Sequence, residues 1–291
     1  MKADTYLAPA KVNLHLRITD VLENGYHALD TSFVYVDVWD VLHIVEADDL
    51  IVGCSEAALT GKKNLVYQVL AAFRALHGVR QGLSVFIEKN LPSQAGLGGG
   101  SSDAATALMV ANQLWGIDAS SQALIAFAAP YGADIPCFLF QQASLATGIG
   151  EKLLPYGQPI PDGKVVLAWP GEGVSTAAAF EHFDAHVFYA LTDEKVVAKV
   201  RARSGGDALE IGLNSLEQSA TALCAPLASL LSAMRDKVEH VWMSGSGSAC
   251  VAVCQTSEQA VALADELQQQ KLASWTHIGH FLPKHPWQTK V

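Results

Sequence analysis

The segment that decides the fold reads PSQAGLGGGSSDAA and occupies residues 92–105. Four of the five residues 96–100 are glycine, and a helical pattern follows over Asp103 to Trp115, ended by Gly116. Glycine permits positive φ and lets a ligand approach the backbone closely. The first N–H groups of a helix are unpaired and carry partial positive charge. This segment therefore predicts a cradle for an anion, best suited to a polyphosphate, to which Ser101 and Ser102 add hydroxyl groups.

Two common phosphate-binding motifs do not describe this loop. No Lys-Ser or Lys-Thr follows the glycines, and Ser101 stands where a dinucleotide-binding loop has its third glycine. A dinucleotide-dependent oxidoreductase is still a rival reading, since Asp118 lies 20 positions after Gly98, but no βαβ unit surrounds the loop. A plain turn is the other alternative. A second loop, Ser244–Ser248, favours a tight turn by itself, although it suits a wall that closes over phosphates.

Hydrophobic periodicity around these loops predicts a mixed set of strands and helices. Lys11–Thr19 alternates apolar and polar residues, which is typical of a strand with one buried face. Short strands are expected to follow residues 132–136. Without regular βαβ alternation, the chain is expected to be α+β. Further strands are expected at Ser32–Asp37, Val41–Glu46, Leu83–Ile87, Val165–Trp169, His240–Met243 and Ala249–Cys254. Helices are expected after a cap at Asn64, over Ser121–Ala129 after Ser120, and over Ser257–Gln270.

Composition limits the class of protein. The 291 residues are 50% hydrophobic and 16% charged, which excludes a disordered chain. The formal charge of −10 excludes a chain-wide attraction to nucleic acid or anionic lipid. No secretory signal is visible, and prolines and Asp134 interrupt the most apolar stretch, so a cytoplasmic protein is expected. The five cysteines show no zinc-like spacing and are expected to be buried, reduced thiols.

Three segments, in order along the chain, resemble the motifs of the GHMP kinases. Residues 8–14 (APAKVNL) resemble the first motif, residues 92–105 the second, and residues 243–249 (MSGSGSA) the third. The resemblance implies a two-domain GHMP kinase fold. Residues 1–155 would form a ribosomal protein S5-like, ATP-binding N-terminal domain. Residues 156–291 would form a ferredoxin-like C-terminal domain that contributes to the substrate site, after a linker rich in Pro and Gly.

Other segments are similar to one branch of this family, which phosphorylates the 2-hydroxyl of a cytidine diphosphate-linked methylerythritol in isoprenoid precursor synthesis. They are residues 25–27 (GYH), 132–138 (GADIPCF), 170–176 (PGEGVST) and 214–217 (NSLE). Ser215 replaces the branch's Asp, and Ser248 a commoner Ala, but neither is an expected catalytic group. The resemblance implies ATP and Mg²⁺ as cofactors, with no protein ligand identified for the metal. It implies a small-molecule substrate, a monomer or homodimer, and no nucleic-acid or membrane partner.

The same resemblance assigns two catalytic residues. Asp134 would face the substrate hydroxyl, and an aspartate is ordinarily ionised at neutral pH and able to accept a proton. Lys11 would keep that carboxylate ionised and oriented. From spacing alone, an aspartate making local turn hydrogen bonds is the favoured interpretation of Asp134, and the alternative for Lys11 is a solvated lysine at a strand edge.

The binding residues implied by the resemblance fall into two groups. For four of these residues a purely structural interpretation is the alternative. Asn64 would then be only a helix cap and Lys89 only a surface cation, while Phe33 and Phe180 would pack in the core. The expected ATP-binding residues are Pro92, Gly96, Leu97, Gly98, Gly99, Gly100, Ser101, Ser102, Asn64 and Lys89. The expected substrate-binding residues are Asn13, Tyr26, His27, Phe33, Thr176 and Phe180, whose aromatic rings would sandwich a pyrimidine.

Two further rivals remain besides the oxidoreductase. One is another small-molecule GHMP kinase, of the homoserine or mevalonate type, which Tyr26-His27 and the GADIP segment disfavour. The other is a non-catalytic nucleotide-binding protein, which the presence of both Lys11 and Asp134 disfavours.

Overall fold

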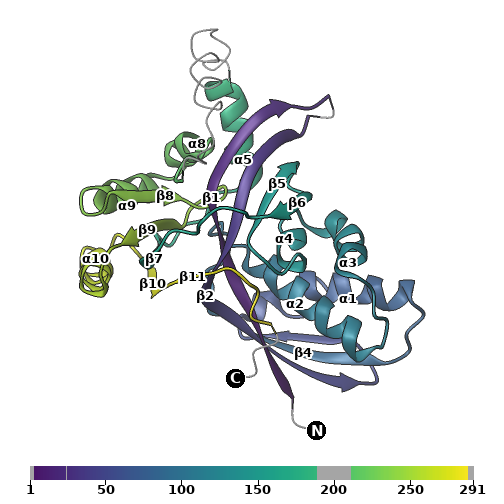
Figure 1. Cartoon of the computed structure of the whole chain (residues 1–291). Helices are drawn as coiled ribbons and strands as arrows, with labels where there is room; N and C mark the ends of the chain where they lie inside the picture. Colours follow the sequence, from purple (N-terminus) through teal and green to yellow (C-terminus); the bar gives the residue numbers. More distant parts are fainter. Residues whose placement is uncertain (1–2, 24, 189–210, 288–291) are drawn as a thin grey trace.

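The computed structural model describes residues 3–23, 25–188 and 211–287. Two long, curved strands run through the molecule, with helices α1 to α4 on one side and a smaller sheet with α8 to α10 on the other (Figure 1). Strands and helices are mixed and most strand pairs are antiparallel, so the α+β expectation is confirmed.

The larger sheet is built on β1 (Asp4–Val21) and β2 (His27–Ala47), which pair along almost their whole length. Its order is β3-β4-β2-β5-β6, and β1 and β11 also pair with β2. The remaining strands are β3 (Ile51–Cys54), β4 (Gly82–Glu88), β5 (Ser144–Gly148), β6 (Lys152–Pro155) and β11 (Phe281–Leu282). Its helices are η1 (Ala57–Leu59), α1 (Leu65–Leu76), α2 (Gly99–Leu114), α3 (Ser121–Ala128), η2 (Ala129–Tyr131) and α4 (Ile135–Leu139).

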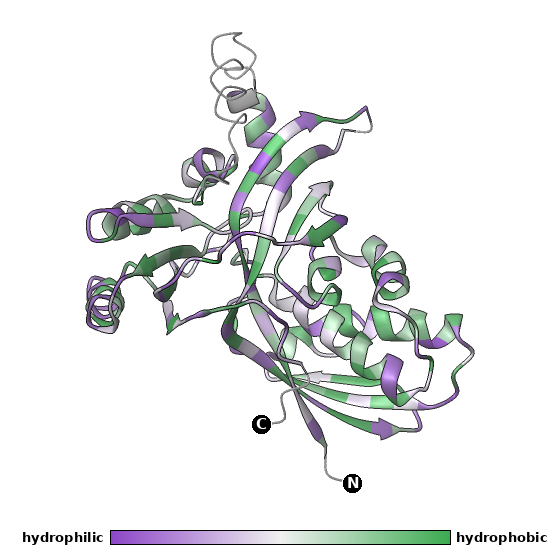
Figure 2. Cartoon of the chain, viewed as in Figure 1, coloured by the Kyte–Doolittle hydropathy of each residue, from purple (hydrophilic) through white to green (hydrophobic). Residues whose placement is uncertain are grey.

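The smaller sheet has the order β10-β7-β9-β8. In Figure 2, β9 is hydrophobic along its length, whereas α10 carries many hydrophilic residues. The apolar side of α10 joins the buried core of this sheet through Leu263 and Leu267. The strands are β7 (Lys164–Trp169), β8 (His240–Met243), β9 (Cys250–Cys254) and β10 (Trp275–Gly279). The helices are α5 (Thr176–His182), the π-helix η3 (Phe183–Phe188), α8 (Glu217–Leu223), α9 (Ala225–Arg235) and α10 (Ser257–Gln269).

A third buried cluster joins the two sheets. Val12 and Leu14 of β1 pack in one core with Leu167 of β7 and Trp242 of β8. The Trp242 indole Nε1 donates a hydrogen bond of 2.8 Å to the backbone oxygen of Asn13. The sheets are therefore fixed against each other at the middle of β1, where the first motif lies.

Several local predictions are confirmed. The Asn64 side chain accepts from the Val66 N–H and caps α1, and the Ser120 hydroxyl accepts from the Ala123 N–H and caps α3. Gly116, at φ +62°, follows the end of α2. All five cysteines lie in the described part of the chain, where each is buried and free. No helix among the described residues is long and apolar enough to cross a membrane.

Three local predictions are wrong. Ser32–Asp37 and Val41–Glu46 belong to one strand, because the residues between them form a bulge opposite Pro9 and Ala10. Residues 135–139 form the helix α4 before the chain enters β5. The polar face of β1 is also buried, since Lys11 and His15 are each only 2% exposed. The division into domains after residue 155 stays a prediction.

Candidate active site

A cavity of about 1580 Å³ lies where the two sheets meet. Its wall is formed by β1, the glycine-rich loop, the start of α4, the start of α5 and the second Gly/Ser loop. Ligand sites commonly measure about 300–1,000 Å³. The cavity is therefore large enough for two small molecules side by side.

Lys11 and Asp134 meet on this wall. The Lys11 ammonium nitrogen lies 3.4 Å from Oδ2 of Asp134 and donates a 2.9 Å hydrogen bond to Oδ1 of Asn13. It also lies 5.4 Å from the centre of the Phe33 ring. Lys11 is buried, while the side chain of Asp134 is 36% exposed. Lys11 is therefore not a solvated lysine at a strand edge. The Asp134 carboxylate faces the cavity beside the fixed Lys11 cation.

The three motif segments converge around this pair. The Lys11 N–H donates to the backbone oxygen of Leu97, and the Ser244 hydroxyl donates to that of Gly96 while accepting from the Asn13 N–H. A Cβ on Gly96 would collide with the Ser244 carbonyl. Segments separated by more than 200 residues thus form one continuous backbone surface.

The glycine-rich loop enters α2 through Gly98, whose φ of +72° is left-handed. A Cβ at Gly98 would lie 3.0 Å from the Phe138 ring and 3.1 Å from Cγ of Lys11. The position therefore requires glycine on two counts, conformation and space. The helix begins at Gly99 rather than at Asp103, so the loop itself supplies the first unpaired N–H groups.

The structure brings most, but not all, of the expected nucleotide residues to the cavity. Leu97 packs in the core that joins the sheets, because its side chain is apolar and points inward. Ser102 is fully buried on the inner side of α2. Neither residue forms part of the wall. The expected residues on the wall are Pro92, Gly96, Gly98, Gly99, Gly100, Ser101, Asn64 and Lys89.

Three aromatic side chains, Tyr26, His27 and Phe180, line the cavity and form what is called the aromatic cluster below. The rings of His27 and Phe180 stack with their centres 4.6 Å apart, and His27 Nε2 lies 2.6 Å from Oδ1 of Asp184. Tyr26 is 60% exposed and lines the same wall. Thr176 lies at the start of α5, where its hydroxyl is 2.8 Å from that of Ser246.

Comparisons with known proteins agree with this arrangement. Residues 64–142 match the GHMP kinases N terminal domain, and residues 194–273 match the GHMP kinases C terminal domain. A 4-diphosphocytidyl-2-C-methyl-D-erythritol kinase of Cupriavidus taiwanensis is 37% identical over 84% of this chain and 82% of its own. The same enzyme of Desulfitobacterium hafniense is 36% identical over 93% of this chain and 94% of its own.

The chain belongs to the 4-diphosphocytidyl-2-C-methyl-D-erythritol kinase family. A crystal structure of a 4-(cytidine 5'-diphospho)-2C-methyl-D-erythritol kinase superposes with a TM-score of 0.75. The two are 31% identical, and the match covers 95% of this chain and 98% of the other. The two-sheet GHMP kinase fold is therefore confirmed.

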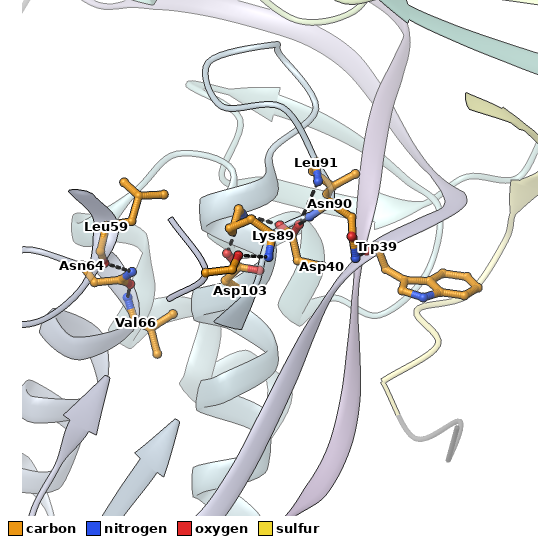
Figure 3. A network of polar contacts seen from close by, with 10 residues as sticks. Trp39, Asp40, Leu59, Asn64, Val66, Lys89, Asn90, Leu91 and Asp103 are labelled. Carbon is orange, nitrogen blue, oxygen red and sulfur yellow. Dashed lines mark hydrogen bonds and ion pairs between the residues drawn. The ribbon is translucent and has the colours of Figure 1, made fainter. Parts of the chain in front are cut away.

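In this member of the 4-diphosphocytidyl-2-C-methyl-D-erythritol kinase family, Lys89 is not the surface cation that the sequence left open. It is buried between two carboxylates, pairing with Asp40 and, at 2.8 Å, with Asp103 (Figure 3). Asn64 lies on the wall, yet its amide is occupied by the Val66 N–H and by the Leu59 carbonyl. Its predicted cap is thus confirmed, whereas a nucleotide contact stays a prediction.

Sequence reasoning missed four polar residues of this region. Asp40 carries a signal that could have been used, because it interrupts the apolar run VWDVL at residues 38–42, and a carboxylate buried there needs a partner. Asp103 and Ser246 lie within the second and third motif segments, which do not by themselves assign them a role, and Asp184 carries no such local signal. The four residues are Asp40, Asp103, Asp184 and Ser246.

Proposed function

We propose that this chain transfers the γ-phosphoryl group of ATP to the 2-hydroxyl of 4-diphosphocytidyl-2-C-methyl-D-erythritol. The observation that carries the proposal is the Lys11–Asp134 pair, which faces one cavity between a glycine-rich helix start and an aromatic cluster. Family membership supports the same substrates. The proposal includes a cytoplasmic enzyme, active as a monomer or homodimer, with its domains divided after residue 155.

The nucleotide binds at the glycine-rich loop in this proposal. The N–H groups at the start of α2 have no partner within the helix and carry partial positive charge. They suit the oxygens of a triphosphate. Gly99, Gly100 and the Ser101 hydroxyl line the cavity at this point.

Asp134 acts as the proton acceptor. As the acceptor oxygen attacks the γ-phosphorus, its proton passes to the Asp134 carboxylate, and the bond to the β–γ bridging oxygen breaks. Lys11, 3.4 Å from that carboxylate, keeps it oriented and stabilises negative charge on the attacking oxygen. Positioning two bound substrates supplies about 7–11 kcal/mol. A general base supplies about 10²–10⁴-fold, so geometry contributes more than proton transfer.

The cytidine ring binds at the aromatic cluster. Stacking on an aromatic face stabilises a planar base, and the Tyr26, His27 and Phe180 rings lie on the cavity wall. Because Asp184 holds the His27 ring, His27 presents a fixed edge. Phe33 lies beneath the Lys11 ammonium, so it supports the catalytic pair as well as the wall.

Mg²⁺ would reach this site with the nucleotide. The ion usually keeps several waters and is held by one or two carboxylates together with substrate phosphates. Within residues 3–23, 25–188 and 211–287 no group of three or more His, Cys, Asp or Glu side chains could hold a metal. Asp134 is assigned to the proton in this proposal, so substrate phosphates and waters would hold the ion, and no protein ligand is assigned to it. When bound, Mg²⁺ neutralises charge on the transferred phosphoryl group.

An acceptor panel tests the proposed function. The purified protein is incubated with ATP and Mg²⁺ and with 4-diphosphocytidyl-2-C-methyl-D-erythritol, free methylerythritol, homoserine or mevalonate, and ADP release is measured. We expect ADP release with the cytidylyl compound alone. Preference for homoserine or mevalonate would contradict the assignment, and no ADP release with any acceptor would support a non-catalytic nucleotide-binding protein.

A further inference from the structure

A buried carboxylate holds the chain that leads into the glycine-rich loop. Asp40, on β2, is 0% exposed. Its Oδ1 accepts hydrogen bonds from the backbone N–H groups of Asn90, at 2.6 Å, and Leu91, at 2.9 Å. These two residues connect the end of β4 to the loop. Its Oδ2 pairs with the Lys89 ammonium (Figure 3).

Lys89 extends this anchor to α2. Its ammonium donates to Oδ2 of Asp103, 2.8 Å away, in the first turns of the helix. Gly99 sits directly on the cluster, because a Cβ there would lie 3.3 Å from Oδ2 of Asp40 and 3.4 Å from Nζ of Lys89. Lys89 and Asp103 reach the cavity wall, whereas Asp40 lies behind them. The three side chains therefore join β2, β4 and the nucleotide end of α2.

The cluster holds one more carboxyl group than it has cations. Burial raises the pKa of Asp103 to about 8, with Lys89 lowering it and the neighbouring Asp40 raising it further. The groups that face Asp103 are Lys89 from the end of β4, Asp40 from β2 and the Cys54 thiol from β3. Oδ1 of Asp103 is buried and meets no hydrogen-bond partner among the residues that the structure describes. A proton on Asp103 leaves the cluster uncharged, and its loss leaves one buried negative charge.

We propose that Asp40, Lys89 and Asp103 position the nucleotide end of the site, with Asp40 fixing the loop entrance and a proton on Asp103 keeping the cluster uncharged beneath the nucleotide. Asp40 is thus a positioning residue, which acts through Lys89 and through the backbone. The inference rests on the proposed function, because it requires an anionic nucleotide at the glycine-rich loop. An uncompensated negative charge under that loop repels such a ligand strongly, since screening is weak in the interior.

Measuring nucleotide binding directly tests whether a proton on Asp103 supports binding. The dissociation constant of ADP is measured by calorimetry at pH 7.5 and pH 9, where ADP itself is fully ionised. We expect affinity to fall at least threefold at the higher pH, because the Asp103 proton is lost between these values. Asp103→Asn is expected to bind equally at both pH values, since Lys89 and Asp40 then form a neutral pair. Asp162→Asn, at an exposed position, is the matched control and keeps the dependence.

Steady-state kinetics test the positioning. Asp40→Asn places an amide beside the Lys89 ammonium, so we expect the KM for ATP to rise at least tenfold, while the KM for the acceptor is unchanged. Equal changes in both constants, or a pH dependence of ADP binding that persists in Asp103→Asn, would overturn the inference. If Asp40→Asn does not fold, the Asp103→Asn comparison decides alone. Loss of acceptor phosphorylation by the native protein counts against the proposed function only, because ADP binding is measured separately.

Discussion

The Lys11–Asp134 pair shows how a strand pattern can hide a site. Lys11 is 2% exposed, and a buried cation is costly unless it is paired and hydrogen-bonded. Here Asp134, the Asn13 amide oxygen and the face of the Phe33 ring surround the ammonium. The alternating pattern of β1 marks its polar residues as outward-facing, yet they face a second wall, which only the fold supplies.

Replacing the Asp134 carboxylate tests its role as the proton acceptor. We expect Asp134→Asn to lower kcat by about 10²–10⁴-fold, because an amide cannot accept the acceptor's proton. The KM for ATP should change little, since the glycine-rich loop is untouched. Steady-state kinetics with both substrates measure this, with Asp236→Asn, at an exposed position after α9, as the control. Near-normal turnover would remove Asp134 from its catalytic role.

At the scale of elements, the start of α2 tolerates little change. We expect Gly98→Val to abolish nucleotide binding, because the left-handed φ of +72° is strained for any β-branched residue and the side chain would press on Phe138 and Lys11. Calorimetric titration with ADP measures the loss, and circular dichroism verifies the fold. Gly157→Val is the control, because nothing lies within 4 Å of a Cβ there. Unchanged ADP affinity in a folded Gly98→Val variant would refute the cradle.

The sequence predicted the helices and strands that are stabilised by interactions between residues close together in the chain. The caps at Asn64 and Ser120, and the strand Leu83–Ile87, were predictable because capping and alternation involve only nearby residues. The continuity of β2 was not, because its bulge depends on pairing with Pro9 and Ala10. α4 was also missed: at five residues it is too short for periodicity, and buried packing stabilises it.

The same limit applies to the site. The glycine-rich loop could be identified from spacing, and Lys11 and Asp134 from the family motifs that contain them. The Asp40–Lys89–Asp103 cluster unites residues 49 and 14 positions apart, and although Asp103 lies in the second motif, no motif marks the three as a cluster. The pairing of Asp184 with His27 bridges 157 positions. Such contacts follow from sheet topology, which one sequence does not specify.

The C-terminal segment contains a buried histidine, His285, whose protonation affects stability. His285 is 8% exposed, accepts a hydrogen bond from the Trp287 N–H, and packs edge-on against Tyr35 and Phe138. Burial lowers the pKa of His285 to about 3. The folded state therefore holds this ring neutral, whereas the unfolded chain takes up a proton near pH 6.5. Its contribution to stability is complete above pH 6.5 and is lost as the pH falls toward 3.

We expect the free energy of unfolding to fall by a few kcal/mol between pH 7 and pH 4, and His285→Asn to flatten this dependence while lowering stability at pH 7. Denaturant unfolding at a series of pH values measures both. His240→Asn, at an exposed position on β8, is the control and should keep the native slope. An identical slope in His285→Asn would show that this histidine is not the group that titrates.

At the scale of the whole molecule, the cavity depends on the junction of two sheets. The glycine-rich loop comes from the larger sheet, whereas Phe180 and Thr176 come from α5 after β7, and the core between Val12 and Trp242 holds the two parts together. Each ligand in the proposed function contacts one end of the cavity. Ligands at separate ends should stabilise the same folded state independently.

Thermal unfolding tests this division of the cavity. A ligand at 100 times its Kd stabilises the folded state by about 2.7 kcal/mol, so ADP and CDP should each raise Tm, and together raise it further. Phe180→Ala removes the ring stacked on His27, so we expect it to lose the CDP shift and keep the ADP shift. Phe86→Ala, at a ring that is 46% exposed and outside the cavity, should keep both shifts. If Phe180 stacks on the cytidine compound only, its removal can affect the Tm shift caused by CDP but not the shift caused by ADP. Equal loss of both Tm shifts in Phe180→Ala would therefore mean that the two nucleotides share one end of the cavity.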